Sequence, residues 1–174
     1  MKTVLKIVGG LVGLLALVLV LFLAYARTHD GPIAIIPGGP FERGELHTGP
    51  EPDWSAMRTR SEVEFQLLDP PRSRITWIAE HENRIYIVSG YMNTTFGKIW
   101  KQWPHEVEQD NRILLRVDDT IYERQLVRIM EGPMIEPVLA MIADKYLPEG
   151  TTLGDPAETI RNGDAWLYEV APRS

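Results

Sequence analysis

Residues 74–89 read RITWIAEHENRIYIVS, and this stretch decides the fold that the sequence predicts. Two runs rich in β-branched and aromatic side chains, at 74–81 and 84–89, flank the polar pair Glu82-Asn83. Such side chains fit the pleated surface of a sheet, and two runs around a short polar pair are typical of a β-hairpin. The stretch therefore predicts two antiparallel strands, with Trp77 facing the core.

The segments around this hairpin extend the same pattern. Alternation or β-branched content predicts strands at residues 62–68 (EVEFQLL, ending at Pro70-Pro71), 112–117 (RILLRV), 120–129 (TIYERQLVRI) and 165–170 (AWLYEV). The polar pair Asp118-Asp119 separates the second and third of these and predicts another hairpin. Together with the first hairpin, this makes about six strands, most of them joined in hairpins.

Helices are predicted between and after the hairpins. Residues 97–109 have helical character that is interrupted at Pro104. Pro133 suits the start of a helix, because the first turn does not need the N–H that proline lacks. That helix is expected to run through residues 136–146, where apolar side chains recur at helical spacing. About six antiparallel strands with two or three helices favour an α+β fold, a small barrel with helices at its ends.

The N-terminus contains a long apolar segment. Residues 7–26 carry no charge, while Lys2 and Lys6 precede them and Arg27 follows. Twenty helical residues at about 1.5 Å each cover the roughly 30 Å hydrocarbon core of a bilayer, so the segment predicts one transmembrane helix. The bias of basic residues predicts a cytoplasmic N-terminus and an extracytoplasmic domain. Residues 24–26 (AYA) also fit a signal-peptide cleavage site, and that alternative places the domain on the same side.

The chain is expected to divide into three parts. Residues 1–26 form the membrane anchor, or a signal that is not cleaved. Residues 27–53, with GPIAIIPGGP and HTGPEP, are rich in proline and glycine and predict a linker or an extended arm along the domain. Residues 54–174 are expected to form one barrel domain, since their length allows a substantial core.

Composition excludes several classes of function. Apart from Lys2 and Lys6, the chain has 16 basic and 24 acidic residues, a formal charge of −8, which argues against nucleic-acid binding. There is no cysteine, so disulfides, thiolate catalysis and cysteine-ligated metals are ruled out. The four histidines show no metal-ligand spacing, and the motifs H-E-x-x-H, G-x-S-x-G and the P-loop are absent. No metal site and no catalytic residue are therefore assigned.

Three successive segments, SRITWIAEHENRIYIVSG, KIWKQWPHEVEQDNR and ILLRVDDTIYERQLVRI, resemble a known family. Over about residues 62–130 the chain resembles the split β-barrel flavin-binding proteins, especially the deazaflavin-dependent nitroreductase-like branch and its pyridoxamine-phosphate-oxidase relatives. The resemblance implies an antiparallel split β-barrel with FMN or a deazaflavin against it, and a homodimer with the cofactor at the interface. The sequence departs from the family at residues 90–95 (GYMNTT), which replace a longer phosphate loop, and in its predicted export.

Four residues would hold the cofactor phosphate if the resemblance extends to the site. Arg74 and Thr76 match the R-x-T strand of the family, and Lys98 and Lys101 lie on the segment that commonly supplies a phosphate lysine. Arginine offers a planar fork to phosphate and lysine a point charge. The alternative is that these cations are solvated or paired with nearby carboxylates such as Glu106.

Four further residues are candidates for contacts with a planar ligand. Trp100 and Trp103 present faces on which a heteroaromatic ring can stack, although tryptophans more often fill a core. Asn93 and Thr94 lie in a polar segment that leads into a predicted helix, where amides and hydroxyls suit an anion. A capped loop, with Thr94 or Thr95 as the N-cap, explains the same residues without a ligand.

The sequence thus leaves two functions open. One is a membrane-anchored oxidoreductase that uses FMN or a deazaflavin, with the protein orienting the cofactor. The other is an extracytoplasmic module that binds a small ligand or a protein without catalysis. The two differ in whether the basic residues converge on one cleft wide enough for a tricyclic ring.

Overall fold

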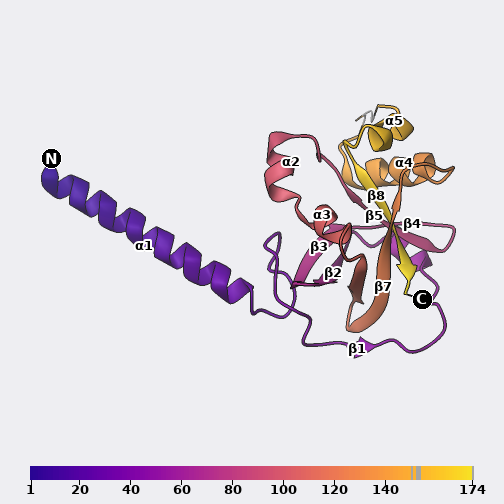
Figure 1. The fold of residues 1–174 in the computed structure, drawn as a ribbon, viewed down its shortest axis with the longest axis horizontal. Coiled ribbons are helices and arrows are strands. Elements are labelled where there is room, and N and C mark those ends of the chain that lie inside the picture. Colours follow the sequence, from indigo (N-terminus) through magenta and orange to yellow (C-terminus); the bar gives the residue numbers. More distant parts are fainter. Residues whose placement is uncertain (150, 152–153, 174) are drawn as a thin grey trace.

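The computed structural model describes residues 1–149, 151 and 154–173, and in this part of the chain eight strands form one sheet (Figure 1). The strands are β1 (Glu45–Leu46), β2 (Glu62–Leu68), β3 (Pro71–Trp77), β4 (Ala79–His81), β5 (Arg84–Ser89), β6 (Arg112–Val117), β7 (Thr120–Ile129) and β8 (Trp166–Pro172). Their order is β3-β2-β6-β7-β8-β5-β4, with antiparallel neighbours, while the short β1 pairs parallel to β7. This curved sheet is an antiparallel half-barrel, and the predicted α+β class is confirmed.

Both predicted hairpins are present. Glu82 and Asn83 have φ angles of 52° and 58°, the left-handed pair that a two-residue hairpin turn requires, and they join β4 to β5. Asp118, with φ of 54°, turns between β6 and β7. A third hairpin, at Asp69-Pro70, joins β2 to β3. It was not predicted, because Pro70-Pro71 was expected to end the strand, whereas Pro71 begins β3.

The predicted strand at residues 74–81 is in fact two strands. β3 pairs with β2 and stops at Trp77, whereas β4 pairs with β5 and begins at Ala79. Ile78 lies between them and is fully buried. The chain changes its pairing partner at this residue, so the alternation of side chains does not continue through it. Trp77 is consequently 38% exposed, and the prediction that it faces the core is wrong.

Helices cover the two sides of the sheet. They are α2 (Thr95–Trp100), α3 (Trp103–Val107), α4 (Ile135–Tyr146), α5 (Pro156–Arg161) and the 3₁₀ turn η1 (Ser55–Arg58). One apolar cluster packs α3 and η1 on the sheet around Phe65, Leu115 and Tyr168, and a second packs α4 and α5 around Tyr86 and Leu167. Pro104 lies in the first turn of α3, which explains why it separates α2 from α3.

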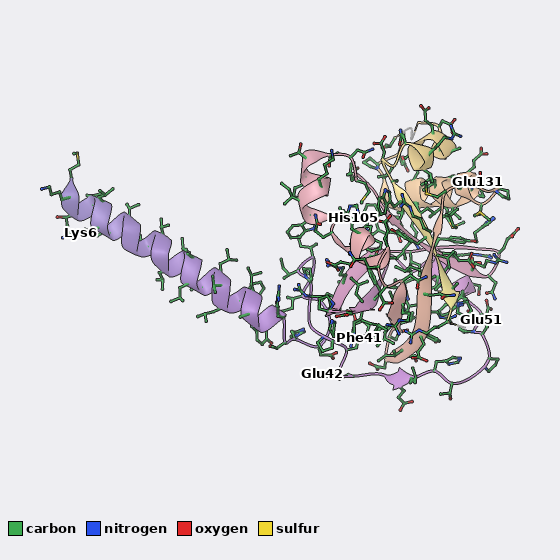
Figure 2. All side chains as sticks on the ribbon, in the orientation of Figure 1. Lys6, Phe41, Glu42, Glu51, His105 and Glu131 are labelled. Carbon is green, nitrogen blue, oxygen red and sulfur yellow. The ribbon has the colours of Figure 1, made fainter. Side chains whose placement is uncertain are left out.

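The N-terminal helix α1 (Lys2–Ala26) projects from the domain (Figure 1). Its mean hydropathy reaches 3.0, and it is long and apolar enough to cross a membrane or to act as a signal sequence. Figure 2 shows its side chains pointing outward on all sides, and only Ala26 is buried. Residues 27–53 then run along the domain, where Asp30 forms an ion pair with Arg116 of β6 at 2.8 Å.

Candidate functional site

A pocket of about 720 Å³ opens where the end of β3 meets α2, α3 and α4. Its walls are mainly apolar. Trp77 contributes from β3, Trp100 and Trp103 from α2 and α3, and Leu139 and Ile142 from α4. A cavity of this size with apolar walls is in the range that binds drug-sized ligands and cofactors.

The mouth of the pocket is formed by two segments far apart in the chain. Tyr91 and Thr94 come from the loop before α2, and Ala34 and Ile35 come from the loop that follows α1. An isolated pairing of Ile33 with Ile36 makes that loop a tight turn, with Ala34 at a φ of 50°. The segment next to α1 therefore borders the pocket directly.

Lys101 is the cation of the pocket. It follows α2 directly, and its backbone N–H donates to the carbonyl of Gly97 at 2.7 Å. Burial lowers the pKa of its ammonium, and the neighbouring positive charge of Arg74 lowers it further. Lys101 forms no ion pair in the part of the chain that the structure describes. A half-buried cation without a counter-ion favours an anion at this position.

Arg74 lies near Lys101, outside the pocket lining, and only part of its guanidinium has a polar partner. Its Nη2 is 3.6 Å from Oε2 of Glu106, so the predicted alternative of pairing with a carboxylate is realised here. Its Nε is buried and, among the described residues, has no hydrogen-bond partner. Burial lowers the pKa of the guanidinium, although Glu106 opposes this effect. Arg74 does not line the pocket, but its charge acts on Lys101, which does.

The remaining predicted site residues divide into two groups. Thr76 and Thr94 line the pocket with Trp100 and Trp103. Thr94 is also the N-cap of α2, because its Oγ1 accepts a hydrogen bond from the N–H of Gly97 at 2.9 Å. The capping alternative is therefore confirmed for this residue.

Lys98 and Asn93 do not line the pocket. Lys98 is exposed on α2, and the side-chain amide of Asn93 donates to Oδ1 of Asp164 at 2.8 Å and to the carbonyl of Asn162 at 3.1 Å. The structure thus brings together five of the eight predicted site residues, but of the three basic candidates only Lys101 lines the pocket, so these cations do not converge on one cleft.

Sequence reasoning missed the wall that α4 provides. Tyr146, at the end of α4, stacks on Trp77, with ring centroids 4.5 Å apart. Leu139 and Ile142 of α4 line the pocket itself, and their helical spacing indicated only a helix with a buried face. Ala34 and Ile35 were also missed, because no local pattern shows that a linker segment returns to a pocket.

A second, smaller cleft of about 430 Å³ has charged walls. Its cations are already paired: Arg116 with Asp30 and Glu64, and Arg60 with Asp118. Because these charges already pair with one another, this cleft attracts a charged ligand less strongly than the pocket beside Lys101 does. Among the described residues, no group of three histidines or carboxylates is placed to hold a metal ion.

Comparison with known proteins gives similarity only to solved structures. No protein-family model matches the chain, and no curated protein matches it. A candidate pyridoxamine 5'-phosphate oxidase from Listeria innocua is 10% identical, with a TM-score of 0.44 over 68% of this chain and 88% of that one. A conserved hypothetical protein from Mycobacterium tuberculosis is 13% identical, with a TM-score of 0.45 over 68% and 76%. A candidate 5-nitroimidazole antibiotic resistance protein from Bacteroides thetaiotaomicron is 13% identical, with a TM-score of 0.46 over 74% and 82%. These similarities concern the fold and leave the deazaflavin-dependent branch untested.

Proposed function

We propose that the pocket binds FMN or a deazaflavin and that the protein is an oxidoreductase of the nitroreductase-like type. The observation that carries the proposal is Lys101, a half-buried cation without a carboxylate partner beside a pocket walled by tryptophans. A phosphorylated tricyclic cofactor fits both features of the pocket, since its phosphate would pair with Lys101 and its ring would contact the apolar walls. When bound, the cofactor supplies hydride transfer.

The residues of this chain would bind and orient the cofactor. Lys101 would hold the phosphate, while Arg74 strengthens the positive potential from behind. Trp100 and Trp103 would flank the ring, and Thr76 and Thr94, which also line the pocket, would lie near its polar edge. The apolar wall on α4 would exclude water from the ring face.

The proposal also includes the location of the protein. We infer that α1 is retained as a single membrane span, with Lys2 and Lys6 on the cytoplasmic side and the pocket on the opposite side. The reductant must then reach the pocket outside the cytoplasm.

Titration of the full chain in detergent tests the cofactor. FMN, riboflavin and a deazaflavin cofactor are added while their fluorescence and absorbance are followed. Lys101→Met is expected to weaken FMN binding about tenfold or more, because a hydrogen bond to a charged group contributes about 1.5–3 kcal/mol. Riboflavin, which has no phosphate, should bind both proteins equally.

Lys98→Met is the matched control, since Lys98 is exposed on the same segment and outside the pocket. It is expected to leave FMN affinity unchanged. If a folded wild-type chain shows no saturable binding of any of these cofactors, the oxidoreductase proposal is wrong.

A second candidate is a module that binds an apolar anion without catalysis. The favouring observation is the N-cap of α2: Thr94 already occupies the N–H of Gly97, which a phosphate loop would leave free. The planar dye anilinonaphthalene sulfonate probes this candidate. Saturable dye binding that depends on Lys101, together with no binding of any flavin, would support it over the oxidoreductase.

A further inference from the structure

The most exposed apolar side chains of the domain lie on α2, on the loop before it and on the loop after α1. Outside α1, the four most exposed large apolar side chains among the described residues are Ile35 at 80%, Ile99 at 73%, Phe96 at 68% and Tyr91 at 67%. Trp100 joins them, 44% exposed and stacked on Phe96 with centroids 6.0 Å apart. These five residues are here called the mouth face. A contiguous exposed apolar surface of this kind marks a binding surface.

The two segments that carry the mouth face differ in charge from the rest of the domain. Residues 31–41 and 90–105 contain no aspartate or glutamate, although the chain has 24 acidic residues. The second segment instead carries Lys98 and Lys101. Aromatic side chains mixed with lysines are typical of surfaces at the headgroup level of a bilayer.

One member of the mouth face, Ile35, is carried by a loop that is held close to the end of α1. The N–H of Gly39 donates to the carbonyl of His29 at 2.9 Å and closes the loop that follows α1. Asp30 fastens the base of this loop to Arg116 at 2.8 Å, and Ile35 lies at its tip. Figure 1 shows α2 on the side of the domain that faces α1.

We propose that the mouth face lies on the surface of the same bilayer that α1 spans. Phe96, Ile99 and Trp100 enter the interfacial region, and Lys98 meets the lipid phosphates. The proposal rests on α1 being retained as a span. If the proposed function also holds, the pocket opens at the lipid surface, and its substrate is an apolar or amphipathic molecule dissolved in the bilayer.

A single labelled position tests the contact. The chain has no cysteine, so Ile99→Cys creates one exposed attachment site for a fluorescent label. The full chain is reconstituted in vesicles of phosphatidylcholine and phosphatidylglycerol, and some lipids carry a nitroxide near the headgroup. Leu46→Cys is the control, because Leu46 is 52% exposed in β1, away from the mouth face.

The expected result is quenching of the label at position 99 by the lipid nitroxide at least about twofold stronger than at position 46. Aqueous iodide should show the opposite order. Equal quenching at the two positions by both quenchers would overturn the proposal. Protection from iodide without quenching by lipid would overturn it as well, since a second chain would then cover the face, and a lower ratio of protein to lipid would remove that protection. Cofactor binding in detergent needs no bilayer, so its outcome is independent of this result.

Discussion

The indole of Trp77 and the phenol ring of Tyr146 are stacked, with centroids 4.5 Å apart and planes only 3° from parallel. The hydroxyl of Tyr146 accepts the N–H of Ile78 at 3.0 Å and lies 2.6 Å from the carbonyl of Ser61. The last turn of α4 is thereby fastened to the point where β3 ends and β4 begins. This contact fixes Trp77 as a pocket wall at the residue where the chain changes its pairing partner.

Replacing Tyr146 by phenylalanine tests this fastening. Tyr146→Phe keeps the ring stack but leaves the N–H of the buried Ile78 without its acceptor. We expect a loss of about 1–2 kcal/mol in the free energy of unfolding, which lowers Tm by about 2–8 °C. Thermal unfolding of the full chain in detergent, followed by near-ultraviolet circular dichroism, measures the shift. Tyr91→Phe, at an exposed tyrosine, should leave Tm unchanged. Equal Tm values for the two variants would contradict the fastening.

Glu80 is the buried acid of the β4–β5 hairpin. It is fully buried, and its carboxylate accepts hydrogen bonds from the guanidinium of Arg58 and from the N–H of Asn83. Glu80→Ala removes the acceptor for both, and we expect a loss of about 2–3 kcal/mol in the free energy of unfolding. Chemical denaturation measures it. Glu82→Ala changes an exposed acid in the same hairpin and serves as the control. A loss no larger than that of the control would show that the pair contributes nothing net.

Local signals explain which parts of the fold could be predicted from the sequence. The turn at Glu82-Asn83 was predicted because a polar pair between two β-branched runs suits left-handed backbone. The break at Ile78 has no such signal, since a β-branched residue also fits a continuous strand. β3 pairs with β2, and β4 pairs with β5. Residues 74–81 are therefore divided into two strands by pairing in space, for which the sequence contains no local signal.

The burial of a charged side chain could not be predicted from the sequence, for a similar reason. Arg124 of β7 is only 3% exposed, although an arginine on a strand is usually exposed to solvent. Its compensation comes from Glu51, whose carboxylate lies 2.8 Å from Arg124 Nη1 although the two residues are far apart in the chain. The residue type alone does not reveal a partner contributed by a distant arm.

In the candidate site, Lys98 and Lys101 lie in different environments although they are only three residues apart. Lys98 and Lys101 would lie near each other on a continuous helix, because residues three apart share a face. The helix α2 instead ends at Trp100, and Lys101 has φ of −89° and ψ of 62°, outside the helical region. Lys101 therefore lines the pocket while Lys98 stays exposed. The position of the helix end, which patterns predict least well, decides which lysine is available to a ligand.

The loop after α1 should respond to acid through Asp30. Burial raises the pKa of this carboxyl, but hydrogen bonds from the N–H of Glu42 and from Arg116 outweigh it, so the folded pKa is lowered. A lowered carboxyl pKa contributes stability above the unfolded value of 3.8, and this stability is lost as the pH falls through the folded pKa. Asp30→Asn is therefore expected to lower stability by about 1–2 kcal/mol at neutral pH.

The difference between wild type and Asp30→Asn should shrink as the pH falls below about 4 toward the lowered folded pKa, because the wild-type carboxyl then takes up a proton. Values of Tm measured across the acid range for the full chain in detergent check this convergence. Asp119→Asn changes an exposed acid near the same cleft and controls for net charge. A difference that stays constant down to the lowest pH would show that the charge of Asp30 is not what holds the loop.

Lys101 should lower the stability of the protein without a ligand. Burial and the charge of Arg74 lower the pKa of its ammonium below the usual 10.5, so the folded state disfavours the charged form. Stability should therefore rise as the pH increases through the lowered pKa, because the unfolded chain then holds the extra proton. Lys101→Met removes this penalty and is expected to raise stability by about 0.5–1 kcal/mol at neutral pH. The gain should disappear in alkaline solution.

Unfolding of wild type, Lys101→Met and Lys98→Met between neutral and alkaline pH measures this effect, with the exposed Lys98 as the control that should not respond. A stability gain that accompanies a loss of FMN affinity would mean that the lysine is kept for its ligand at a cost to the fold. If Lys101→Met is instead less stable than wild type, the ammonium stabilises the protein by itself. An anion site beside Trp100 and Trp103 would then lack its main support.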